Sequence, residues 1–275
     1  MTTTFTLVAF HDFKRTLGKM NAVVECAELA IRKFIHEAET ARDRGAFVEW
    51  ASSEFEVKVD TLDIPLLKQL SAQFHIASVH QEFETFLRNA ALELRGVPIP
   101  KPQDKSLLES TLVSLLGNYE KAKDSVGRFE IELAEYYRLV RNGFAHSAAE
   151  GKTRKDVDAL RKLVEQHDGT MSKLNAPNAF SAIEFDDFIL FTRVVKQLGH
   201  NLCRAVRPLD EEIVSMITRL NQTGHRNVNF KKLKGQSQAP DRLHRALVGL
   251  LRTLYSLEES ESTPIVELLM NGPLA

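Results

Sequence analysis

Hydrophobic residues recur every three or four positions along most of the chain, which is the spacing that places them on one face of an α-helix. Proline, glycine and asparagine interrupt this pattern at intervals and divide it into segments of helical length. The pattern predicts helices over residues 13–46, 65–94, 106–116, 125–142, 153–167, 183–206, 208–220 and 241–257, with Pro264 beginning a last short helix. The alternating stretch 55–59 predicts either one short strand or an extended linker.

These elements predict an all-α fold, an antiparallel helical bundle with additional N- and C-terminal helices. We expect three parts: a long helix and connector over 1–64, a helical core over 65–170, and a C-terminal helical extension over 171–275. A proline-containing connector at 96–102 lies inside the core, and a long polar segment at 221–240 lies inside the extension. The sequence contains no internal repeat, which argues against a solenoid.

Composition narrows the class of protein without naming a function. The chain has 275 residues and a net charge of −1, from 36 basic and 37 acidic side chains, which argues against a uniformly cationic nucleic-acid binder but leaves room for a local basic face. The two cysteines, Cys26 and Cys203, form no zinc-ribbon or thioredoxin motif. No apolar run reaches the roughly 20 residues of a membrane span, so we expect a cytoplasmic protein without a membrane partner.

The segment Arg141-Asn142-Gly143-Phe144-Ala145-His146 carries the most specific chemical pattern, at the predicted end of an amphipathic helix. Arginine presents a fork of donors that suits phosphate oxygens, and histidine exchanges protons near neutral pH. Four arginine–histidine pairs in the chain are separated by four to six residues, and only this one has asparagine directly after the arginine.

In this motif, and in the preceding segment 78–89, the chain resembles the HEPN family over about 65–167. The segment 183–191 is similar, more loosely, to a downstream helix of one bacterial branch of the family. The resemblance implies a metal-independent endoribonuclease without a cofactor, which acts on RNA as a homodimer and serves as a toxin or phage-defence effector, with a cognate antitoxin as a further partner. It assigns phosphate stabilisation to Arg141 and acid–base chemistry to His146. Three roles stay open for Asn142: to orient the histidine, to bind the backbone at the helix end, or to hold the substrate.

Other interpretations of the same residues stay open. Arg141 near a helix end and Asn142-Gly143 after it also describe an ordinary helix stop, and some HEPN proteins are non-catalytic dimerisation or nucleic-acid-binding modules. His80 and Glu84 form either a second shell near His146 or, with Arg88, an exposed ladder, and we favour the ladder. Basic side chains in two clusters are candidate RNA contacts: Lys152, Arg154, Lys155, Arg226, Lys231, Lys232 and Lys234.

Overall fold

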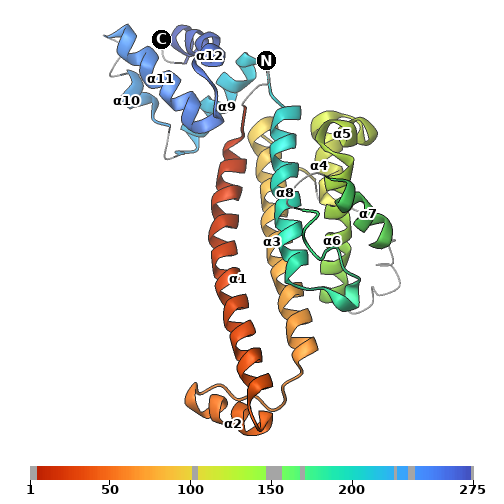
Figure 1. The fold of residues 1–275 in the computed structure, drawn as a ribbon. Coiled ribbons are helices and arrows are strands. Elements are labelled where there is room, and N and C mark those ends of the chain that lie inside the picture. The colour runs from red at the N-terminus through yellow and green to blue at the C-terminus, as the bar shows by residue number, and fades with distance from the viewer. Residues whose placement is uncertain are drawn as a thin grey trace. The chain divides into compact units, whose positions relative to one another are not determined.

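The computed structural model describes residues 5–100, 105–146, 157–167, 171–225, 228–234 and 239–273, with the backbone alone at 145, 146 and 234. These residues form twelve α-helices and one 3-10 turn and contain no β-strand, so the chain is an all-α helical bundle, as the hydrophobic spacing predicts (Figure 1). The elements are α1 (Val8–Thr40), α2 (Arg44–Glu54), α3 (Ile64–Arg95), α4 (Leu107–Leu116), α5 (Tyr119–Val126), α6 (Arg128–His146), α7 (Val157–Gln166), η1 (Phe180–Ala182), α8 (Phe185–Ala205), α9 (Asp210–Gln222), α10 (Phe230–Lys234), α11 (Pro240–Tyr255) and α12 (Glu259–Asn271).

The helices form two compact units that are built from non-consecutive parts of the chain. Unit 1 comprises Met1–Lys14, Phe83–Ile131 and Lys196–Ala275, and unit 2 comprises Arg15–Glu82 and Glu132–Val195. The three-part division expected from the sequence remains a prediction.

Unit 2 is a bundle of long helices whose apolar stripes face one another. Its long helices α1, α3, α6 and α8 contribute buried side chains that include Leu17, Ile35, Ile76, Val79, Leu133, Tyr136, Val140, Phe188, Phe191 and Val194. The first predicted helix was expected to continue to residue 46, but α1 ends at Thr40 because Asp43 caps a new helix, its carboxylate accepting a hydrogen bond from Ala46 N at 3.1 Å. The stretch 55–59 follows α2 as a turn and linker and forms no strand.

The buried stripe of α3 in unit 2 differs from the one that the sequence predicts. The helical spacing places Leu70 and Phe74 on the apolar stripe of this helix, but they have 36% and 59% of their surface exposed. Ala72, Ile76 and Val79 are buried instead, on a different face of the helix. The error arises because apolar residues occupy two faces of this helix, and periodicity alone does not say which face a neighbour covers.

Unit 1 has an aromatic core where the first turns of α1 meet α3. Phe10, Phe13, Phe83 and Phe86 are buried, and the ring centroids of Phe13 and Phe86 lie 5.1 Å apart. The first helix begins at Val8, five residues before the predicted start, because the carboxylate of Glu93 on α3 accepts hydrogen bonds from Val8 N at 3.0 Å and Ala9 N at 2.8 Å. A carboxylate from another helix therefore accepts the hydrogen bonds of the first amides of α1, which a local N-cap residue usually accepts.

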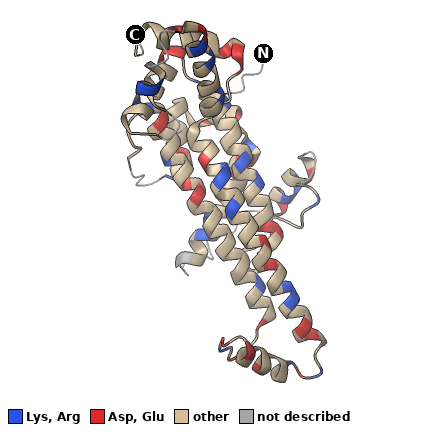
Figure 2. Ribbon diagram, turned by 90° about the vertical axis from the view of Figure 1, so that its left-hand side faces the viewer, with Lys and Arg blue, Asp and Glu red and all other residues tan. Residues whose placement is uncertain are grey.

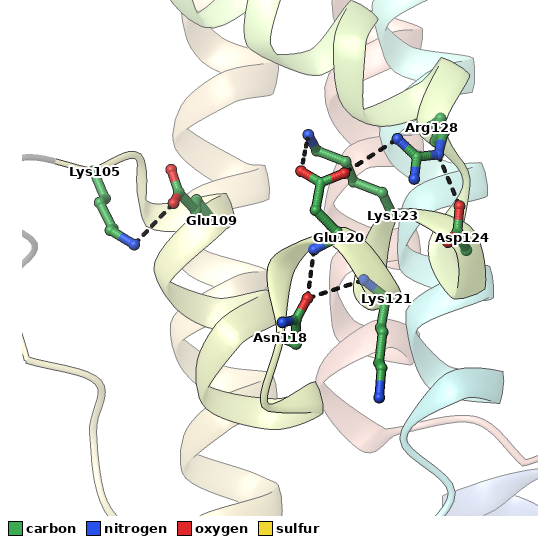
Figure 3. A network of polar contacts seen from close by, with 8 residues as sticks. All are labelled: Lys105, Glu109, Asn118, Glu120, Lys121, Lys123, Asp124 and Arg128. Carbon is green, nitrogen blue, oxygen red and sulfur yellow. Dashed lines mark hydrogen bonds and ion pairs between the residues drawn. The ribbon is translucent and has the colours of Figure 1, made fainter.

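The helices that lead into α6 are shorter and more numerous than the spacing predicts. Asn118, expected to help end α4, caps α5 by accepting hydrogen bonds from Glu120 N and Lys121 N at 2.9 and 3.2 Å (Figure 3). Asp124, expected as an opening residue of the next helix, lies inside α5 and pairs with Arg128 at 2.7 Å, and Gly127 with φ +116° separates α5 from α6. The sequence allows either Asp104 or Ser106 to cap α4, and Ser106 is the cap, while Gly117 ends the helix as expected.

The C-terminal elements of unit 1 are α9 to α12. Pro264 lies inside α12 and does not begin it, because Glu258 and Glu261 form a capping box ahead of Pro264. Tyr255, at the end of α11, stacks on Phe5 with ring centroids 5.5 Å apart, so the described N-terminal residues pack on α11 within unit 1.

Candidate functional site

The candidate motif lies on the last two turns of α6, in unit 2. The sequence predicts that the helix stops at Asn142-Gly143, but α6 continues to His146. Gly143 is buried, and a Cβ atom there would lie 2.8 Å from Cε2 of Phe180. The glycine therefore permits a close approach between α6 and η1, and it does not end the helix.

Arg141 and Asn142 are adjacent, partly exposed and in direct contact. Nη1 of Arg141 donates a hydrogen bond to Oδ1 of Asn142 at 3.0 Å. Arg141 has no carboxylate partner among the described residues, whereas Arg138, one turn earlier, pairs with Glu135 at 2.7 Å.

The helical register places the third motif position, 146, relative to Arg141 and Asn142. Positions 142 and 146 are four residues apart and lie on one face of α6, with position 141 on the neighbouring face. The side chain of His146 lies outside the part of the chain that the structure describes. Phe144, between them, packs edge-on against the exposed Phe74 of α3 with ring centroids 4.8 Å apart.

A buried polar network holds the motif helix against α8. Asp187, fully buried, accepts hydrogen bonds from the hydroxyl of Tyr137 at 2.9 Å, from Asn178 N and Nδ2 at 2.8 Å each, and from Glu184 N at 2.9 Å. Burial raises the pKa of Asp187, and the hydrogen bonds act in the opposite direction. Burial and the charge of Asp187 raise the pKa of Tyr137 well above its usual value, so this hydroxyl stays a donor.

Arg161, one of the basic residues that follow the motif in sequence, has a structural role. Its Nε donates to the carbonyl of Pro177 at 2.8 Å and its Nη2 to Oδ1 of Asn178 at 2.5 Å. Tyr136 of α6 also donates to the carbonyl of Asn178. Asn178 therefore connects α6, α7 and α8, a function that the sequence did not suggest because the residue lies in an irregular loop.

The candidate RNA contacts are only partly described. Lys231 and Lys232 are exposed on α10, in unit 1. Lys152, Arg154, Lys155 and Arg226 lie outside the described residues, as does the side chain of Lys234. Where side chains are described, acidic and basic residues are interspersed along the helices (Figure 2).

The residues proposed as a second shell occupy different environments. His80 is buried in unit 2, so the expectation that it belongs to an exposed ladder is wrong for this residue. Glu84 pairs with Arg88 at 3.1 Å on the surface of unit 1, so the expected ladder forms at this pair. His75, one turn before His80, lies edge-on to Phe188, and burial lowers its pKa.

Comparisons with known proteins add no identification, because no family model, curated protein or solved structure matches this chain. Within the described residues, no helix is both long and apolar enough to cross a membrane. The same residues contain no group of three or more histidine, cysteine or acidic side chains placed to hold a metal ion.

Proposed function

We propose that this protein is a metal-independent endoribonuclease of the HEPN type, acting in a toxin or phage-defence role. The observation that carries the proposal is the pair Arg141–Asn142, which is partly exposed, joined by a 3.0 Å hydrogen bond and free of any carboxylate partner among the described residues. Arg138, one turn earlier on the same helix, is by contrast paired with Glu135 at 2.7 Å. A guanidinium held beside a histidine position is suited to the charge of a phosphodiester.

The chemistry assigns one task to each residue. His146 removes the proton from the ribose 2′-hydroxyl or protonates the leaving 5′-oxygen, since histidine is the side chain that most often exchanges protons in catalysis. Arg141 stabilises the charge that develops on the phosphorane oxygens. Asn142 orients the guanidinium through the hydrogen bond to its Oδ1. The products are a 2′,3′-cyclic phosphate and a 5′-hydroxyl, so no water enters the first step.

An exposed apolar stripe near the motif supports a homodimer. Leu66, Leu70 and Phe74 on α3 follow one another at four-residue spacing and have 46%, 36% and 59% of their surface exposed. Phe74 contacts Phe144, two residues after Asn142. Contiguous exposed apolar side chains commonly mark protein interfaces, so a second copy on this stripe would bring a second motif close to the first.

Cleavage of labelled single-stranded RNA in the presence of EDTA tests the proposal. Arg141→Ala and His146→Ala are expected to lower the rate about 10²–10⁴-fold, the usual contribution of an acid–base or charge-stabilising group. Arg138→Ala and His36→Ala are matched controls, since Arg138 already has an acidic partner and His36 is exposed on α1. Undiminished cleavage by both motif variants, with unchanged circular dichroism, would refute the catalytic assignment.

The exposed stripe also favours a second candidate function, a non-catalytic dimerisation or nucleic-acid-binding module. This alternative predicts that the wild-type chain leaves RNA intact while Phe74→Glu converts a dimer to a monomer in sedimentation experiments. Cleavage that depends on Arg141 and His146 would exclude it.

A further inference from the structure

A row of aromatic side chains crosses from α1 onto α2, the short helix that joins α1 to α3 in unit 2 (Figure 1). The ring centroids of Phe34 and Phe47 lie 5.6 Å apart, and those of Phe47 and Trp50 lie 5.8 Å apart. The ring of Phe55 meets that of Trp50 edge-on at 6.5 Å. Phe34 and Phe47 are partly buried, whereas Trp50 and Phe55 have 55% and 69% of their surface exposed. The row therefore starts in packing against α1 and ends in two solvent-exposed rings, which are typical of protein interfaces.

The end of α2 fixes the backbone beside these two rings. The amide of Val57 donates a hydrogen bond to the carbonyl of Ser52 at 3.0 Å, and Glu56 between them has a left-handed conformation with φ +54°. This is the arrangement of a Schellman motif, in which the chain closes over the last turn of the helix. Phe55 is the C-cap of the helix, so it is held next to Trp50 before any partner binds. A surface ordered in advance loses little conformational entropy on binding.

Three acidic side chains are adjacent to the two rings in the sequence. Glu49 precedes Trp50, and Glu54 and Glu56 lie on either side of Phe55. All three are exposed, and none has an ion pair or a hydrogen bond among the residues that the structure describes. The basic residue that follows them, Lys58, is already paired with Asp60 at 3.1 Å. The last turn of α2 contains no basic side chain, and the C-terminal end of a helix dipole adds further negative charge.

The basic side chain of α2 lies at the opposite end of the helix. Arg44 is the first residue of α2 and Glu54 is the last, so the rise of the helix separates them by about 15 Å along its axis. This separation exceeds the Debye length of about 8 Å at physiological ionic strength, beyond which surface charges are largely screened. Arg44 therefore does not neutralise the carboxylates beside Phe55, and the exposed rings lie in a region of negative charge.

We propose that Trp50 and Phe55, together with Glu49, Glu54 and Glu56, form a docking surface for an extended, arginine-containing segment of a partner protein. A guanidinium stacks on an aromatic ring through its planar face and donates paired hydrogen bonds to a carboxylate through its edge, so this surface offers both kinds of contact. A nucleic acid would also stack on the rings, but its phosphates would meet three unpaired carboxylates. The docking surface contains none of the motif residues of α6, so the proposal is independent of the nuclease activity.

Intrinsic fluorescence of the full chain tests the proposal directly, because Trp50 is the only tryptophan in the sequence. The probe is a capped heptapeptide of alternating glycine and arginine. The comparators are the same peptide with citrulline, the neutral isostere of arginine, and a single-stranded oligodeoxynucleotide, which lacks the 2′-hydroxyl that the proposed nuclease attacks. The arginine peptide is expected to change the emission saturably and to bind about tenfold more tightly than the citrulline peptide. Absence of a saturable change, equal affinity for the citrulline peptide, or tighter binding of the oligonucleotide would overturn the proposal, the last by assigning the rings to base stacking.

Matched variants locate the docking surface. The double substitution Glu54→Gln, Glu56→Gln is expected to weaken binding of the arginine peptide about fivefold, whereas Glu132→Gln, at an exposed position of α6, leaves it unchanged. Phe55→Ala is expected to weaken binding about threefold to fivefold, and Leu29→Ala, on α1 and 71% exposed, retains it. Because Glu54, Glu56 and Phe55 are exposed, these variants keep the fold, which far-ultraviolet circular dichroism verifies. Wild-type affinity in both the double variant and Phe55→Ala would show that the peptide binds elsewhere and would end the proposal.

Discussion

Asp187 offers the sharpest test of how the motif helix is held, because all four of its hydrogen bonds are donated to it. Oδ1 accepts from the Tyr137 hydroxyl and Asn178 N, and Oδ2 accepts from Asn178 Nδ2 and Glu184 N, all between 2.8 and 2.9 Å. In Asp187→Asn one of these oxygens becomes an NH₂ group, whichever way the amide is turned. Two of the four hydrogen bonds are then lost, because the two groups that donated to that oxygen now face an NH₂ group, which is itself a donor.

The magnitude follows from these contacts. Two hydrogen bonds to a charged acceptor contribute about 3–6 kcal/mol together. Relief of the buried charge, whose cost is the reason that burial raises the pKa of Asp187, offsets part of this loss. We therefore expect Asp187→Asn to lower the free energy of unfolding by about 3 kcal/mol.

Urea titration followed by circular dichroism measures this change, and Asp186→Asn is the matched control. Asp186 is the neighbouring residue of the same helix turn, and its carboxylate accepts one hydrogen bond, from Asn175 N at 2.8 Å. The control is expected to cost less than about 1 kcal/mol. A loss in Asp187→Asn no larger than that in Asp186→Asn would refute the reasoning, since it would mean that the four donors do not depend on a carboxylate.

Three further changes test other parts of the fold. The pKa of Glu93 is raised from 4.5 to about 7, so between these pH values the folded state keeps a proton that the unfolded chain releases. The free energy of unfolding should therefore fall as the pH rises through this range. Glu93→Gln should flatten the decline, which urea midpoints measured across the same pH range would show. Gly199→Ala would place Cβ 2.4 Å from the ring of Phe10 and should lower the free energy of unfolding by about 1–3 kcal/mol. Gly249→Ala, with no atom within 4 Å of its Cβ, should instead stabilise its helix by up to about 1 kcal/mol. Equal shifts of the melting temperature in the two variants would contradict the packing at Phe10. Ser106→Ala should lower the free energy of unfolding by about 1 kcal/mol because it removes the cap of α4, and Ser106→Asp should restore it.

The parts of the fold that the sequence predicted well are those in which the informative residues are close together along the chain. The limits of α3 and α8 fall within two residues of the expected ranges, because apolar residues at three- and four-residue spacing and the flanking turn residues are enough to define a helix. Ser106 and Gly117 limit α4 for the same reason. The candidate pair Arg141–Asn142 was also found from adjacent residues.

Features that depend on a distant partner were not predictable in this way. Gly143 resembled a helix stop, but it lies inside α6 because the ring of Phe180, 37 positions further along, packs against it. Arg161 follows the motif among other basic residues, as a solvent-exposed arginine would, but its Nε donates a hydrogen bond to the loop carbonyl of Pro177. In both cases the residue type was consistent with two roles, and the residue that packs or bonds against it in the fold determined which role it has.

The sequence by itself determined that this protein is all-helical and where most of its helices run, and it singled out one short segment with an arginine, an asparagine and a histidine as the candidate motif. Tertiary structure alone decided that Glu93 of α3 caps the start of α1 and that Asp187 and Asn178 hold α6 in place. It also decided that Asp12, Glu93 and Arg219 line one cavity. The physical reason is the range of the forces involved. Helical periodicity is expressed within four residues, whereas buried hydrogen bonds and cavities join residues that lie far apart along the chain.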